Sequence, residues 1–189
     1  GWPASRAHYL PNFVPTERAE PVERKSLQTE EGVPLLLALG RLHDNKAFDV
    51  LLHALVDLPE AILWIAGDGP NDMALRKLAA GLGITDRVRF LGWRDDASAL
   101  LATADVLVCP SRIEPLGNVI LEAWAQGIPV VAAAAAGPSA LIRDQESGIL
   151  TQIDDPGSLA RGISQIIEDP DKARDLATAG NKTFRTEYS

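Results

Sequence analysis

Two carboxylates, Glu114 and Glu122, bracket the stretch EPLGNVILE, and their spacing suggests a site for a long polar ligand. Pro115 suits the first position of a helix, where its missing N–H costs nothing. The N–H groups of that first turn would point out of the helix toward an anion, and they belong to Leu116, Gly117 and Asn118. On such a helix the two acids share one broad face, about 12 Å apart along the axis. Each could accept hydroxyl hydrogens from a ligand with an anionic middle.

A simpler interpretation of the two acids stays open. Glu114 would then only favour the dipole at the helix start, and Glu122 would be a solvated helix residue. The apolar neighbours of Glu122, among them Leu121 and Trp124, weigh against a freely exposed position.

Two cations, Arg41 and Lys46, follow the first apolar run and could hold phosphate oxygens. An arginine offers a planar fork of donors and a lysine a compact charge. The alternative is that both are surface cations at a helix start, where the helix dipole disfavours positive charge. The sequence has neither a G-x-G-x-x-G after the first strand nor a P-loop, so the two commonest phosphate signatures are absent.

The elements that must position these residues alternate along the chain. Short apolar runs predict strands at 35–40, 61–67, 87–92, 105–110, 128–137 and 147–153. Helical patterns fill the intervals at 45–58, 71–83, 96–104, 115–127, 154–169 and 169–187. This alternation predicts a single α/β domain with a parallel sheet of about six strands and helices on both faces. Ligands of such sheets bind beyond the carboxyl ends of the strands, so the glycine-rich segments there are the candidate binding loops: 40–42, 67–70, 92–94, 110–117 and 136–139.

Bulk properties exclude several functional classes. The net charge of −8 argues against nucleic acid as the main partner, because phosphate backbones need a basic face. The single cysteine, Cys109, excludes an internal disulfide, fits a reducing compartment and is interpreted as a small core residue. No apolar run approaches the roughly 20 residues of a membrane span, and no signal peptide is visible in the first residues.

Together these residues resemble the C-terminal, donor-binding domain of a retaining GT-B glycosyltransferase of the glycosyltransferase family 4 (glycosyl transferases group 1) type. The resemblance covers about residues 35–170, and the E-x7-E spacing in its sequence context is highly specific. Its carrying segments are GRLHDNK (40–46), GDGP (67–70), GW (92–93), SRIEPLGNVILEAWAQGIPVVA (111–132), GP (137–138) and SGIL (147–150). The resemblance implies one Rossmann-like half of a GT-B fold.

The resemblance also implies roles for individual residues. The donor is a nucleoside-diphosphate sugar, bound in the cleft between two Rossmann-like domains. The implied catalytic residues are Glu114, Arg41 and Lys46. Arg41 and Lys46 would bind the diphosphate and Glu114 the sugar hydroxyls, whereas Glu122 would bind the ribose hydroxyls. Residues near Trp93 and Arg94, and near 111–113, would line the base. The full donor-binding set comprises Gly40, Arg94, Ser111, Arg112, Leu116, Gly117, Asn118, Val119 and Glu122.

The implied reaction is transfer of a hexosyl group to a hydroxyl acceptor with retention, by front-side attack, with no cofactor and no metal. Asp169-Pro170-Asp171 does spell a metal-binding D-x-D, but it falls between two predicted helices, where aspartates cap helix starts. The chain departs from the family pattern at Ala47, where glycine is usual, and at Ala140, where an acid is common. Asn118 varies in the family and bears on donor choice.

The chain is expected to be a fragment, because a complete GT-B enzyme is about twice as long. Residues 1–31 resemble an extended interdomain linker, and residues 32–189 the nucleotide-sugar-binding domain. An acceptor domain would precede them, so the fragment alone is expected to be inactive. The expected partners are the nucleoside-diphosphate sugar, that N-terminal domain and, through it, an acceptor glycan or lipid of lipopolysaccharide or exopolysaccharide synthesis. The expected location is cytoplasmic, with peripheral association at the inner face of the membrane as a further expectation.

Two other functions remain as alternatives. A sugar-nucleotide epimerase of the GT-B fold would share the architecture but lacks this E-x7-E context. A non-enzymatic flavodoxin-like binding module would need no cationic loop after the first strand.

Overall fold

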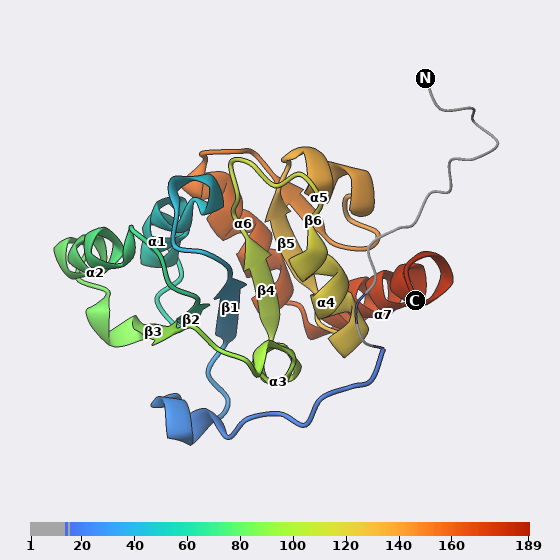
Figure 1. The fold of residues 1–189 in the computed structure, drawn as a ribbon, viewed down its shortest axis with the longest axis horizontal. Coiled ribbons are helices and arrows are strands. Elements are labelled where there is room, and N and C mark those ends of the chain that lie inside the picture. The colour runs from blue at the N-terminus through green and yellow to red at the C-terminus, as the bar shows by residue number, and fades with distance from the viewer. Residues whose placement is uncertain (1–13, 15) are drawn as a thin grey trace.

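A parallel six-stranded sheet forms the centre of the molecule, in the order β3-β2-β1-β4-β5-β6 (Figure 1). The computed structural model describes residue 14 and residues 16–189, so part of the predicted linker, residues 1–13 and 15, lies outside the described residues. The strands are β1 Leu35–Leu39, β2 Ile62–Ala66, β3 Val88–Gly92, β4 Val106–Cys109, β5 Val130–Ala133 and β6 Ile149–Thr151. The prediction of about six parallel strands is confirmed.

Helices cover both faces of the sheet, as predicted. The α-helices are α1 Phe48–Val56, α2 Asp72–Gly81, α3 Ala97–Thr103, α4 Asn118–Gln126, α5 Ala136–Leu141, α6 Pro156–Ile167 and α7 Pro170–Glu187. Short 3-10 helices are η2 Arg24–Leu27, η3 Asp44–Lys46 and η4 Thr85–Arg87. Helices α1, α2 and α6 pack with one apolar cluster, and α3, α4 and the end of α7 pack with the other. Over residue 14 and residues 16–189, no helix combines the length and apolar character needed to cross a membrane.

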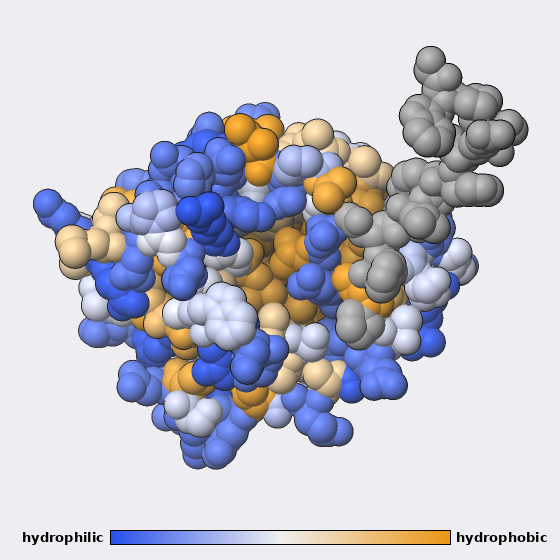
Figure 2. Space-filling model, viewed as in Figure 1, coloured by the Kyte–Doolittle hydropathy of each residue, from blue (hydrophilic) through white to orange (hydrophobic). Residues whose placement is uncertain are grey.

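The strands are apolar along their whole length because both of their faces are covered. In β1, Leu36 and Ala38 contribute to the cluster under α1, whereas Leu35 and Leu37 contribute to the cluster under α4. Alternate side chains of a strand point to opposite faces, so this division follows from the backbone. Figure 2 shows hydrophilic side chains over most of one face of the molecule, with hydrophobic ones gathered near its centre, around β4.

The start of one helix and the end of one strand differ from the sequence prediction in ways that affect the candidate site. Helix α4 begins at Asn118 rather than at Pro115, because Gly117 adopts a left-handed conformation (φ 73°) that cannot belong to the helix. Strand β5 ends at Ala133, and the end of the alanine run enters α5, a helix that the sequence did not predict. Alanine has no polar pattern and favours helices, so a run of alanines gives no signal of where a strand stops.

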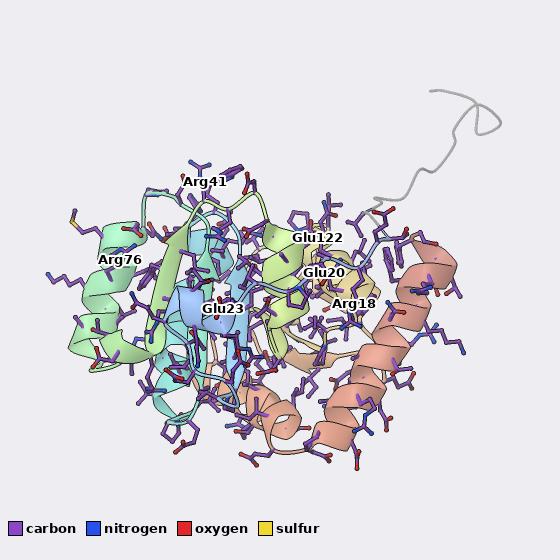
Figure 3. All side chains as sticks on the ribbon, turned by 90° about the horizontal axis from the view of Figure 1, so that it is seen from below. Arg18, Glu20, Glu23, Arg41, Arg76 and Glu122 are labelled. Atoms are coloured by element: carbon purple, nitrogen blue, oxygen red, sulfur yellow. The ribbon has the colours of Figure 1, made fainter. Side chains whose placement is uncertain are left out.

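Residues 17–29, here called the strap, run across α3 and α4 and are held by side chains of the domain. The Gln126 side chain accepts from the N–H of Ala19 (2.8 Å) and donates to the carbonyl of Glu17 (3.1 Å). The Thr103 hydroxyl accepts from the N–H of Val22 at 2.8 Å. Figure 3 shows two further strap residues, Arg18 and Glu20, beside α4. That residues 1–31 link two domains stays a prediction.

Candidate functional site

The chain changes direction at the middle of the sheet, between β1 and β4. From β1 it continues to β2 and β3 on one side, and from β4 to β5 and β6 on the other. A crevice forms outside the carboxyl ends of the strands at such a switch point. The loops after β1 and β4 flank it, and the backbone N–H of Ile113 donates to the carbonyl of Asn45 across it at 3.2 Å.

Lys46 and Glu114 meet at this point. The Lys46 ammonium donates to one oxygen of the Glu114 carboxylate at 2.5 Å. The other oxygen accepts from the N–H of Gly117 at 3.2 Å. The Glu114 side chain is 10% exposed and that of Lys46 26%, so the charges compensate each other in a partly desolvated site. The sequence predicted both residues but not their contact.

Close backbone packing fixes the loop that carries Lys46. A Cβ atom on Gly67 would lie 1.9 Å from the carbonyl oxygen of Gly40, so the loops after β1 and β2 touch backbone to backbone. A Cβ on Gly40 would lie 3.1 Å from Cε of Lys46, whose side chain crosses the space that this glycine leaves. Ala47 adopts φ 52° and ψ 37°, in the left-handed region that favours glycine. The loop therefore follows a path that glycine would adopt at lower cost.

Two adjoining hollows, together called the cleft, open along this edge of the sheet. Their sizes, about 360 and 390 Å³, lie within the range of small-molecule sites. The Lys46 hollow is lined by Leu39, Gly40, Lys46, Glu114, Pro115, Leu116, Asn118, Val119 and Glu122. The Trp93 hollow is lined by Leu39, Gly40, Arg41, Ala66, Gly67, Asp68, Trp93, Arg94, Ala97 and Glu122. A larger hollow of about 780 Å³ lies by the amino ends of β1 and β4 and contains none of the predicted site residues.

Glu122 belongs to both hollows. It projects from α4, and Arg41 projects from the loop after β1 (Figure 3). Burial raises the pKa of Glu122 above its ordinary value, although the positive charge of Lys46 opposes this shift. A half-buried carboxylate at the junction can accept hydrogen bonds from a ligand that occupies both hollows.

The wall of the Trp93 hollow combines an aromatic ring with an oriented arginine. Trp93 is 70% exposed, which leaves its ring open for stacking. Arg94 is held by Asp96 through two bonds, Nε to Oδ1 at 2.7 Å and Nη2 to Oδ2 at 2.6 Å. The hydrogen bond from Arg94 lowers the pKa of Asp96, so this pair stays charged.

Three predicted residues do not line the cleft. Ser111 is buried beside Cys109, Arg112 is bonded to Asp49 in the first turn of α1, and the N–H of Gly117 donates to Glu114. Their roles in donor binding stay predictions. The first turn of the helix lies further along the chain than predicted. Asn118 and Val119, rather than Leu116 and Gly117, begin α4, and both line the Lys46 hollow.

Other sequence interpretations can be checked locally. Asp169 caps α7 by accepting from the N–H of Lys172 at 3.0 Å, as its position between two helices predicted. Cys109 is a buried core residue, and burial raises the pKa of its thiol. Asp68 and Ala97 also line the cleft, although neither was assigned an individual role from the sequence. The glycines around Asp68 did mark its loop, whereas no sequence signal marks Ala97.

Comparisons with known proteins give concordant results. The family described as "Glycosyl transferases group 1" matches residues 19–183. The chain is 42% identical, over its whole length and 55% of the relative, to the lipopolysaccharide core biosynthesis glycosyltransferase LpsE of Rhizobium meliloti. It is 31% identical to Anabaena Alr3699/HepE, solved in complex with UDP-glucose, with a TM-score of 0.83 over 88% of this chain and 47% of that one.

A third comparison concerns the fold alone. The C-terminal domain of LpcC, a glycosyl transferase group 1 family protein of Francisella tularensis, is 22% identical, with a TM-score of 0.79. The match covers 93% of this chain and 98% of that domain. By contrast, the chain spans about half the length of the curated relatives it matches. It covers 55% of LpsE and 52% of LpsD, another lipopolysaccharide core biosynthesis glycosyltransferase of Rhizobium meliloti.

Proposed function

Because this chain belongs to the glycosyl transferases group 1 family, we propose that it is the donor-binding half of a retaining glycosyltransferase. The enzyme would move a hexosyl group from a nucleoside-diphosphate sugar to a hydroxyl acceptor. The observation that carries the proposal is the meeting of Lys46 and Glu114 at the switch point, with Glu122 in the same cleft. The similarity to HepE, which was solved with UDP-glucose, supports a nucleotide sugar as the ligand.

Each cleft residue then has a chemical role. Lys46 and Arg41 hold the diphosphate oxygens and stabilise the negative charge that develops as the diphosphate leaves. These two cations do this in place of a metal ion. Glu114 accepts hydrogen bonds from the sugar hydroxyls, and Glu122 from the ribose. Fixed charges act strongly here because the cleft is partly shielded from water.

The acceptor would bind to a part of the enzyme that lies outside this chain. The similarity to LpsE supports a glycoconjugate acceptor of lipopolysaccharide or exopolysaccharide synthesis. Such a reaction would take place in the cytoplasm, at the inner face of the membrane where a lipid-borne acceptor is presented.

Titration calorimetry with UDP, GDP and ADP tests the proposal on this chain. At least one of them should bind, and Lys46→Gln should weaken it by about 10- to 100-fold, since a hydrogen bond to a charged group contributes about 1.5–3 kcal/mol. Lys77→Gln is the matched control, because Lys77 is exposed on α2 and does not line the cleft. If the intact domain bound none of the three at millimolar concentration, the proposal would be refuted. Product analysis of the full-length enzyme then separates transfer from epimerisation.

A further inference from the structure

Arg112, two residues before Glu114, makes its contacts away from the cleft. Its Nη1 and Nη2 donate to the two carboxylate oxygens of Asp49 at 2.9 and 2.7 Å. Its Nε pairs with Asp154 at 2.5 Å, and Nη1 also donates to the carbonyl of Asp44 at 2.9 Å. These contacts occupy most of the guanidinium fork, which leaves little of it for a ligand.

The partners of Arg112 lie on the segment that carries Lys46. Lys46 stands between Asp44 and Asp49 in the chain, so Arg112 bonds to this segment on both sides of it. The backbone bond from Ile113 to Asn45 joins the same two loops. The segments bearing the cation and the acid of the cleft are therefore tied together next to both residues.

Asp154 adds a third segment to this junction. It lies in the loop between β6 and α6 and adopts a positive φ of 58°, a conformation that aspartate tolerates better than most residues. Its carboxylate reaches the Nε of Arg112. Arg112 therefore joins the loops that follow β1, β4 and β6, three strands from both halves of the sheet.

We propose that Arg112 is a positioning residue, whose bidentate bond to Asp49 holds the Lys46 segment at the distance from Glu114 that a donor diphosphate requires. This inference rests on the proposed function. The Arg112 and Asp49 side chains are 29% and 44% exposed, so solvent screens the pair, but its bidentate geometry and the further contact with Asp154 make it stronger than an isolated surface pair. Its effect on the cleft must therefore be measured separately from its effect on the stability of the domain.

A double-mutant cycle between Arg112 and Lys46 tests the proposal. The probe is whichever of UDP, GDP and ADP binds the wild-type chain most tightly. Arg112→Gln should weaken it about tenfold, within the usual range for coupled neighbours. The same change in a Lys46→Gln background should have less than about a twofold effect, because the cation to be positioned is gone. Arg112→Lys should resemble Arg112→Gln, because lysine cannot replace the fork.

Other outcomes would overturn the proposal. Additive losses from the two substitutions would mean that Arg112 acts on the ligand without Lys46. A lowered unfolding temperature with unchanged affinity would leave Arg112 a merely structural role.

Amide hydrogen exchange without ligand gives an independent readout. Arg112→Gln should speed exchange in residues 41–47 and 113–117 while leaving β2 unchanged, and unchanged exchange in both loops would refute the positioning role. Failure of the wild-type chain to bind any nucleotide would instead refute the proposed function, and the exchange measurement would still decide whether Arg112 fixes the two loops.

Discussion

Replacing Glu114 with glutamine separates the effect of the Lys46–Glu114 contact on stability from its effect on nucleotide affinity. The substitution removes the negative charge but keeps an oxygen that can accept from the N–H of Gly117. The pair lies between an exposed ion pair, which contributes at most about 1 kcal/mol, and a buried one, whose disruption costs about 3–5 kcal/mol. We therefore expect Glu114→Gln to lower the free energy of unfolding by about 2 kcal/mol. For a chain of this size, that corresponds to about 4–8 °C in Tm.

Ligand affinity should change in the opposite direction for the nucleotide alone. In the free protein the Lys46 ammonium is bonded to Glu114, so an incoming phosphate must compete with this carboxylate. Glu114→Gln releases the ammonium, and we expect UDP to bind as well as to the wild type or up to about tenfold more tightly. The affinity for UDP-glucose should increase less than the affinity for UDP, because the sugar hydroxyls no longer have a charged acceptor at position 114.

Calorimetry and thermal unfolding of four proteins measure both effects: wild type, Glu114→Gln, Lys46→Gln and the double variant. The double variant should lose less stability than the sum of the two single losses, since each single change leaves one charge without its partner. Strictly additive stability losses, or equal weakening of UDP and UDP-glucose by Glu114→Gln, would refute the reasoning.

Three further substitutions test other parts of the structure. Trp64→Phe removes the indole donor to the buried Thr29 hydroxyl (2.8 Å), so urea denaturation should show a loss of about 1–3 kcal/mol; an unchanged midpoint would contradict this. Because burial raises the pKa of Glu122, Glu122→Gln should raise Tm at neutral pH, and this gain should vanish below the ordinary pKa of 4.5, where the wild-type carboxyl is protonated in both states; a gain independent of pH would exclude this cause. Gly67→Ala should cost about 3 kcal/mol by forcing the Gly40 carbonyl aside, which near-normal thermal unfolding would disprove.

Local sequence patterns predicted most of the fold, because each buried strand is a short apolar run that ends in a polar or glycine-rich segment. They failed where the local signal was ambiguous. Pro115 was predicted to begin α4, but the left-handed Gly117 delays the helix start to Asn118. The segment AGPSAL of α5 contains both glycine and proline, which normally argue against a helix.

The site was predictable as a set of loops but not as a set of contacts. The rule that ligands bind at the carboxyl edge of a parallel sheet brings Arg41, Lys46 and Glu114 to one region. Nothing in the sequence pairs Arg112 with Asp49, which lies 63 positions away, so its type and position suggested a ligand contact. Such pairings depend on how loops from separate strands pack, which local patterns do not record.

If the cleft binds a ligand as proposed, the junction of β1 and β4 couples that binding to the association of the two halves of the sheet. Its register pairs Leu36 with Val106 and Leu37 with Leu107, a shorter seam than the five pairs between β1 and β2. A ligand that contacts both Lys46 and Glu114 would connect the two halves of the sheet. Its binding would therefore stabilise the state in which β1 and β4 are paired. If the polypeptide were severed between β3 and β4, each piece would carry half of the cleft, and nucleotide would promote their reassociation.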